Sequence, residues 1–147
     1  MPHRASDTEA DALRAWDGNG AIRLLDQDPA NHALLLELCN PGDHLSVAGA
    51  DEGLDVMIDL LPRLWVSAAA PFGSLADEVD RWVGSLPREY ADAGAPFERS
   101  LLDGALETLV DLAASQGEPV LLHQDLHGDN VLRAQREPWL AIDPKPL

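Results

Sequence analysis

The chain has 147 residues, of which 26 are acidic and 10 are basic, and its formal net charge is −16 at pH 7. This length is enough for one domain with a hydrophobic core. The acidity argues against nucleic acid or an anionic membrane surface as a partner. Cys39 is the single cysteine, so no intrachain disulfide can form, and no apolar run reaches the length of a membrane span. We therefore expect a cytoplasmic protein.

The first 40 residues favour one helix followed by two strands. Residues 7–17 combine helix-forming residues with a partial apolar face, and Gly18-Asn19-Gly20 is expected to end this helix. Two apolar runs, at 21–25 and 33–38, predict strands joined by a turn at 26–30. Because so small a sheet leaves an open edge, we also predict self-association through these strands.

The middle of the chain predicts three amphipathic helices, at residues 51–65, 74–90 and 96–117. Ser74 is expected to cap the second helix, because Asp77 follows it three residues later. Pro62 is expected to bend or end the first helix, and Pro87 to interrupt the second. We interpret the apolar stripes of all three helices as core positions.

A polar loop between short apolar runs dominates the C-terminal part. The runs at 120–122, 131–132 and 139–142 predict short buried strands. Between the first two lies His123-Gln124-Asp125-Leu126-His127-Gly128-Asp129-Asn130, and Asp143 follows the third. This pattern presents an acid and an amide on the loop and a second acid at a strand end.

These side chains suit phosphoryl transfer from a nucleotide. Asp125 could orient an attacking hydroxyl and accept its proton. Asn130 and Asp143 offer the hard oxygen ligands that Mg²⁺ prefers. The order of His, any residue, Asp, four residues and Asn is also that of the kinase catalytic loop, and Asp143 stands where a kinase has its metal-binding Asp. His123 is better explained as a structural residue that ties the loop to the core than as a base.

Two other interpretations remain open. His123, Asp125, His127 and Asp129 alternate, so on a true strand they would share a face and could hold Zn²⁺ in a metal-dependent hydrolase. Gly128 would then lie on the buried face, where glycine is a poor strand residue. The third interpretation is a binding module without catalysis. It is supported by the absence of any lysine before Lys145 and of a glycine-rich phosphate loop.

The loop and the segment Ile142-Asp143-Pro144-Lys145-Pro146 together resemble the aminoglycoside phosphotransferases. The closest branch is that of the streptomycin 6-phosphotransferases, or aminoglycoside/hydroxyurea kinases. The segments 12–25 and 34–37 extend the resemblance over nearly the whole chain.

The resemblance implies an α+β, protein-kinase-like fold. Residues 1–40 would be a remnant of the N-terminal lobe with the hinge, and residues 41–147 a truncated helical C-terminal lobe with the catalytic hairpin. Glu37, Leu38 and Cys39 would form the hinge, whose backbone faces the adenine of ATP. Glu9 would stand where kinases have a lysine-pairing glutamate. With no lysine to pair, we favour a solvated acid there.

The activity implied by the resemblance is ATP- and Mg²⁺-dependent phosphorylation of a hydroxyl on a small molecule. An aminoglycoside antibiotic such as streptomycin is the expected acceptor, so the family role would be antibiotic resistance. Asp125 would be the catalytic base, and Asn130 and Asp143 the metal ligands. Without the strand lysine that holds the phosphates, we expect negligible activity from this chain alone; an inactive fragment of the family is the alternative.

Overall fold

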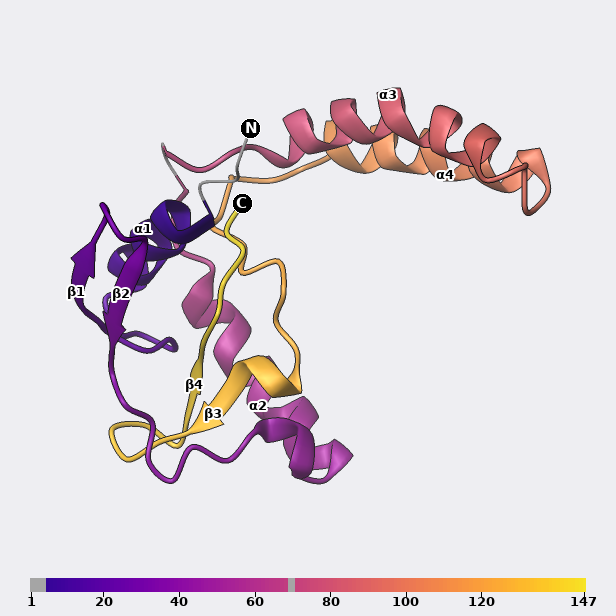
Figure 1. Cartoon of the computed structure of the whole chain (residues 1–147). Coiled ribbons are helices and arrows are strands. Elements are labelled where there is room, and N and C mark those ends of the chain that lie inside the picture. Colours follow the sequence, from indigo (N-terminus) through magenta and orange to yellow (C-terminus); the bar gives the residue numbers. More distant parts are fainter. Residues whose placement is uncertain (1–4, 69–70) are drawn as a thin grey trace. The chain divides into compact units, whose positions relative to one another are not determined.

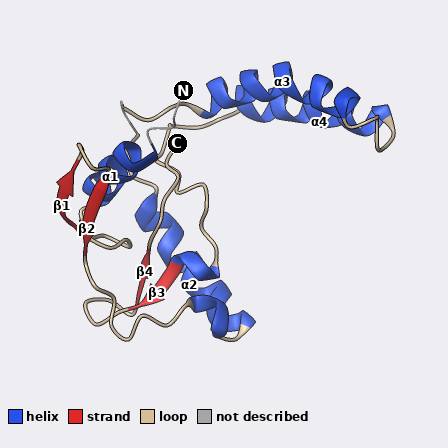
Figure 2. Cartoon of the chain, viewed as in Figure 1, coloured by secondary structure: helices blue, strands red, loops and turns tan. Residues whose placement is uncertain are grey.

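A computed structural model of the chain describes residues 5–68 and 71–147. Figures 1 and 2 show the helices α1 (Ala5–Trp16), α2 (Ala50–Leu64), α3 (Leu75–Asp92) and α4 (Arg99–Ala114). The strands are β1 (Leu24–Asp28), β2 (Ala33–Leu36), β3 (Val131–Arg133) and β4 (Trp139–Ala141), and the short 3-10 helices are η1 (Leu45–Val47) and η2 (Gly128–Asn130). The predicted α+β class is confirmed. None of the helices in these described ranges is both long and apolar enough to cross a membrane.

The chain forms two compact units. The first combines the described residues up to Phe72 with Val120–Leu147, and the second is Gly73–Pro119. The predicted boundary between residues 40 and 41 falls inside the first unit, and the division into a small-lobe remnant and a helical lobe stays a prediction.

The core of the first unit joins helix α1 to the C-terminal hairpin. Leu13 and Trp16 of α1 are buried with Leu64, Leu121 and Leu140. Each buried side chain of this kind contributes roughly 1.5–3 kcal/mol of burial free energy. The Trp16 indole N–H donates to the Leu64 carbonyl at 2.8 Å, so its polar atom is satisfied inside the core.

The chain between α1 and β1 runs beside strand β4. The amide of Ile22 donates to the Ala141 carbonyl at 3.0 Å, and the amide of Ala141 donates to the Gly20 carbonyl at 2.9 Å. Gly20 has a φ of +79°, and a Cβ there would lie 3.3 Å from Cβ of Arg63. Both the backbone conformation and the close approach therefore favour glycine.

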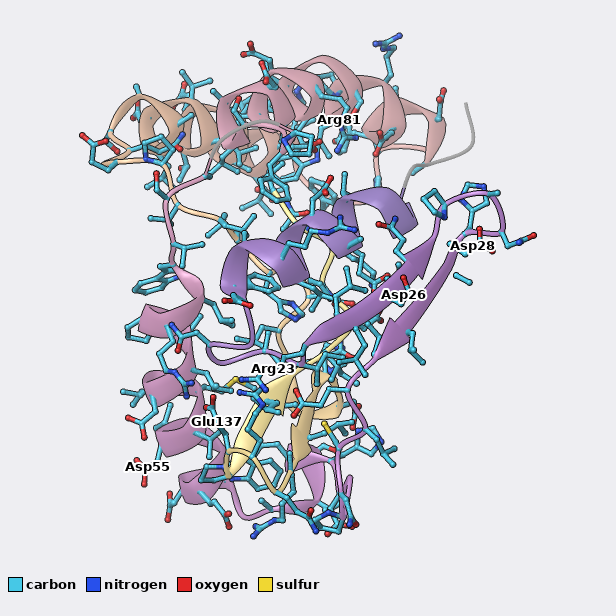
Figure 3. The ribbon with its side chains drawn as sticks, turned by 90° about the vertical axis from the view of Figure 1, so that its left-hand side faces the viewer. Arg23, Asp26, Asp28, Asp55, Arg81 and Glu137 are labelled. Atoms are coloured by element: carbon cyan, nitrogen blue, oxygen red, sulfur yellow. The ribbon has the colours of Figure 1, made fainter. Side chains whose placement is uncertain are left out.

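Strands β1 and β2 form an antiparallel hairpin, with Leu24 opposite Leu36 and Asp28 opposite Ala33. The turn begins later than the predicted 26–30, because the Asp28 carboxylate accepts the amide of Ala30 at 3.1 Å and so forms an Asx-type turn. Asp26 and Asp28, both labelled in Figure 3, consequently belong to the strand.

Strands β3 and β4 pair in antiparallel fashion, as predicted for the C-terminal hairpin. The segment before η1 extends this sheet, since Gly42 donates to the Arg133 carbonyl at 3.0 Å and His44 bridges to Leu132. The predicted strand at 120–122 is wrong. Its residues pair with different segments, Val120 with Ser67 and Leu122 with Leu147, so no continuous ladder forms.

The second unit is the helical pair α3 and α4. The predicted cap is confirmed, because the Ser74 hydroxyl accepts the amide of Asp77 at 3.1 Å. The predicted interruption at Pro87 is wrong, since α3 continues to Asp92. A proline removes one main-chain donor but keeps a helical φ. Beside it, the Arg88 guanidinium donates to the Gly84 carbonyl at 3.1 Å.

Much of the apolar stripe of α4 faces solvent. Leu102 is buried, whereas Phe97, Leu101 and Val110 are about half exposed or more. The interpretation of this stripe as core is therefore wrong for most of its residues. A pair of helices has only one contact face for each helix, which leaves the flanks of a broad stripe uncovered.

Candidate active site

The predicted loop and the segment after β4 lie side by side. The amide of Lys145 donates to the His123 carbonyl at 3.0 Å, and the amide of Ile142 donates to the Asn130 carbonyl at 2.9 Å. Gln124 and Asp143 both adopt positive φ values, of 60° and 53°. Such conformations cost free energy in residues other than glycine and are common at functional sites. These contacts bring the three predicted residues of the loop and strand end into one region.

The carboxylate of Asp125 uses its two oxygens differently. Oδ2 accepts a hydrogen bond from the Lys145 ammonium and lies 3.4 Å from Nδ2 of Asn130. Within the described residues, Oδ1 forms no hydrogen bond and lies 3.8 Å from Nε2 of His127, and about a third of the side chain is exposed. The Lys145 ammonium lowers the pKa of Asp125, against an opposing effect of desolvation. The carboxylate is therefore ionised at neutral pH, with one oxygen open.

Asn130 and Asp143 both have side-chain oxygen atoms that form no hydrogen bond or ion pair with the described residues. The amide nitrogen of Asn130 donates to the Asp125 carbonyl at 2.9 Å, which holds this nearly buried side chain in place. Within the described residues, no hydrogen bond or ion pair engages Oδ1 of Asn130 or the carboxylate of Asp143. The pair therefore offers one amide and one carboxylate oxygen, a donor set that suits a hard cation.

His123 has the structural position predicted for it. The ring is buried, stacks on Trp16 with 5.8 Å between centroids, and places Nε2 at 3.0 Å from the Ile142 carbonyl. A carbonyl only accepts, so Nε2 carries the proton. Nδ1 is then an unprotonated buried atom with no partner among the described residues. Burial lowers the pKa of His123 and keeps the ring neutral.

The geometry does not support the hydrolytic metal site. Residues 123–127 form no strand, so the predicted alternation of ligands on one face does not occur. His123 bonds to Ile142, and Nδ1 of His127 accepts the amide of Asp129 at 3.2 Å. Among the described residues, no group of three or more His, Cys, Asp or Glu side chains could hold a metal ion.

The loop apex is held by residues that the sequence pattern does not predict. The Ser46 hydroxyl donates to the Asp129 carboxylate, and Nδ1 of His44 lies 2.8 Å from the Asp129 carbonyl. A Cβ on Gly128 would lie 2.8 Å from the Ser46 amide nitrogen, so only glycine fits without movement. This close approach explains why glycine occupies position 128.

Glu9 on α1 is a second residue with an unexpected environment. It is partly buried, and both desolvation and the negative charge of Asp143 raise the pKa of its carboxyl. The preferred interpretation of Glu9 as a solvated acid is therefore wrong. The carboxyl of Glu9 is close enough to Asp143 for the two negative charges to interact.

The three predicted hinge residues differ in what they contact. Glu37 forms a bidentate ion pair with Arg136, in which Nε donates to Oε1 at 2.8 Å and Nη2 donates to Oε2 at 2.9 Å. Leu38 is 88% exposed, whereas Cys39 packs against the core, and burial raises the pKa of its thiol. The Glu37 side chain is thus committed to Arg136, and the contact of this segment with adenine stays a prediction.

Arg136 also links the β3–β4 turn to the segment between α1 and β1. Its Nη1 donates to the Gly18 carbonyl at 2.7 Å, and its Nη2 to the Ala21 carbonyl at 3.0 Å. Glu137, labelled in Figure 3, accepts from Arg136 at 2.8 Å and also pairs with Arg63. This network spans a large sequence separation, and no local pattern predicts it.

Comparison with known proteins defines the class. A family model described as aminoglycoside/hydroxyurea antibiotic resistance kinase matches residues 2–147, and the chain belongs to this family. It is 40% identical over 150 residues to the streptomycin 6-kinase of Streptomyces glaucescens, covering 100% of this chain and 48% of the relative. It is 44% identical over 155 residues to the hydroxyurea phosphotransferase of Kitasatospora aureofaciens, covering 100% of this chain and 44% of the relative.

The predicted family is therefore confirmed. A streptomycin 3''-kinase of Klebsiella pneumoniae is a more distant relative, 34% identical over 98% of this chain and 53% of the relative. The chain spans about half the length of the curated relatives that it matches. No solved structure matches it.

Proposed function

We propose that this chain carries the catalytic hairpin of a phosphotransferase that moves the γ-phosphoryl group of ATP to a hydroxyl on a small molecule. The observation that carries the proposal is the joint placement of Asp125, Asn130 and the segment after β4, with one oxygen of Asp125 open. The names of the relatives support the same reaction class. In this proposal the first unit corresponds to the centre of a kinase-like fold.

Asp125 acts as the base of the proposed reaction. Its open Oδ1 accepts a hydrogen bond from the acceptor hydroxyl, which aligns the hydroxyl oxygen with the γ-phosphorus. As the new oxygen–phosphorus bond forms, the bond to the bridging oxygen of ADP breaks and the hydroxyl proton passes to Asp125. Its ionised state at neutral pH is the state that this role requires.

Mg²⁺ is the proposed cofactor, and Asn130 and Asp143 would hold it. When bound, the ion neutralises charge on the nucleotide phosphates. The Asn130 amide nitrogen is bonded to the Asp125 carbonyl, which leaves the amide oxygen for the ion. The Asp143 carboxylate forms no hydrogen bond or ion pair with the described residues. Both oxygens fit Mg²⁺, which usually completes its shell with water and phosphate. The backbone at 37–39 would contact adenine, because the Glu37 side chain is already paired with Arg136.

The proposed acceptor is an aminoglycoside such as streptomycin. This assignment rests on the names of two relatives, and the name of a third offers hydroxyurea as the alternative acceptor. The formal charge of −16 also favours a cationic acceptor over an anionic one.

A chimeric enzyme tests the proposal. Residues 2–147 replace the matching segment of the streptomycin 6-kinase of Streptomyces griseus, which is 41% identical to this chain, and transfer of labelled phosphate to streptomycin and to hydroxyurea is measured. We expect transfer to streptomycin, and we expect Asp125→Asn to lower kcat by at least ~10²-fold, since the amide keeps the shape but accepts no proton.

Asp129→Asn is the matched control, because it makes the same change on a carboxylate that the Ser46 hydroxyl already occupies. A folded chimera with no transfer to either acceptor would contradict the proposed function. Equal rates in the Asp125 variant and the parent chimera would remove Asp125 from the mechanism.

A further inference from the structure

Lys145 is the single lysine of the chain, and its ammonium forms an ion pair with the carboxylate of Asp125, the proposed base. Nζ donates to Oδ2 of Asp125, while the Lys145 amide donates to the His123 carbonyl at 3.0 Å. The side chain is nevertheless 63% exposed. An ammonium has three N–H donors, so donors that do not engage Asp125 remain on this exposed side chain.

The charge around Lys145 marks it as the cation of this site. Its ammonium is paired with the carboxylate of Asp125, and its main-chain amide is bonded to the loop at His123. Within the described residues, no arginine forms a hydrogen bond or ion pair with Asp125, Asn130 or Asp143. In the described part of the chain, Lys145 is thus the one lysine or arginine that pairs with these residues, through the carboxylate of Asp125.

Phosphoryl transfer requires positive charge at the oxygens of the moving group. We propose that Lys145 is a catalytic residue that binds the γ-phosphoryl group with its exposed N–H donors while it holds Oδ2 of Asp125. This inference rests on the proposed function and names a residue for it. By occupying Oδ2, Lys145 leaves Oδ1 as the oxygen that meets the acceptor hydroxyl.

The chemical balance of the step is unchanged by this role. The acceptor oxygen bonds to phosphorus, ADP leaves with the bridging oxygen, and the proton goes to Oδ1 of Asp125. Lys145 keeps all its protons and contributes only charge and hydrogen bonds. In the contrasting role, Lys145 only holds the Asp125 carboxylate in place. Its side chain would then respond equally to nucleotides with and without a γ-phosphoryl group.

Because the chain has one lysine, selective isotope labelling of lysine yields one side-chain NMR signal without any substitution. The labelled full chain is titrated with Mg²⁺–AMP-PNP, which carries a γ-phosphoryl group, and with Mg²⁺–ADP, which lacks one. We expect the signal of the Lys145 side chain to shift with the first nucleotide and to remain near its free position with the second.

Dissociation constants from backbone amide shifts complete the test. We expect AMP-PNP to bind about tenfold more tightly than ADP, as one charge-assisted hydrogen bond supplies. Lys145→Met should remove this preference, and Lys145→Arg should retain part of it. Arg81→Met, on exposed α3, changes the net charge equally and should leave the preference intact.

The outcomes separate the two proposals. If neither nucleotide binds to the unaltered chain, the role of Lys145 is overturned, whereas the proposed function is decided by phosphate transfer in the chimera. If both nucleotides bind but the shift of the lysine signal is the same with and without a γ-phosphoryl group, only the role of Lys145 is overturned.

Discussion

Replacing Arg136 with methionine should destabilise the first unit more than any exposed arginine substitution. Only 21% of this side chain is exposed, and Glu37, its main partner, is 17% exposed. Removing one partner from a buried pair costs about 3–5 kcal/mol, because the other charge stays buried and unpaired. Two backbone carbonyls, of Gly18 and Ala21, lose a donor as well. Partial exposure reduces the cost, so we expect a loss of about 3 kcal/mol.

Urea unfolding followed by circular dichroism measures this loss. A fall of ~3 kcal/mol corresponds to roughly 10 °C in Tm for a chain of this size. Arg99→Met is the control, because its ion pair with Asp103 is more than half exposed and is worth about 0.3–0.5 kcal/mol. Glu37→Gln and the double variant complete a cycle, in which we expect a coupling of at least ~1.5 kcal/mol. Equal losses in the Arg136 and Arg99 variants would refute the argument.

Three further predictions follow from the same contacts. Burial lowers the pKa of His123 below its ordinary value of 6.5, against opposing effects of the Ile142 carbonyl and two acids. The contribution of the neutral ring to stability is therefore full above about pH 6.5 and is lost as the pH falls. The drop in Tm between pH 7.5 and 5.5 should be smaller in His123→Gln than in the unaltered chain. Leu35→Glu should weaken self-association in sedimentation runs at several concentrations, since Leu35 is exposed on the small β1–β2 sheet; an unchanged monomer would contradict the association. Gly128→Ala should destabilise the chain by about 1–3 kcal/mol in thermal unfolding, whereas Gly84→Ala, where a Cβ meets open space on a helix, should stabilise it by about 0.5–1 kcal/mol.

Local patterns in the sequence were sufficient to predict the helices and the loop. The Ser74 cap and the helical pattern of α2 and α3 depend on residues a few positions apart, so the sequence displays them directly. The predicted core stripe of α2 is nevertheless wrong for Leu54, Ile58 and Trp65, which are about half exposed or more. The same holds for the spacing from Asp125 to Asn130. The family resemblance then supplied the chemistry that these positions suggest, and the family comparison confirms that membership.

Contacts between distant segments could not be predicted in this way. The Asp28 turn shifted the first hairpin because a side chain, not the apolar pattern, determines where β1 ends. The apolar stripe of α4 predicts core positions, yet a residue is buried only where another element packs against it, and much of this stripe is exposed. The Arg136 and Ser46 contacts join segments more than 80 residues apart, and neither residue has a local motif that marks it.

The position of the proposed base depends on the core through a continuous set of contacts. Trp16 bonds to the end of α2 through its indole N–H and stacks on His123 with its ring face. His123 in turn contacts the Ile142 carbonyl, next to Asp143, and its own carbonyl accepts the amide of Lys145. The site is therefore held by buried groups, while the side chains of Asp125 and Lys145 are partly exposed. In the chimeric enzyme, substitutions in this core should therefore lower kcat by displacing the proposed base.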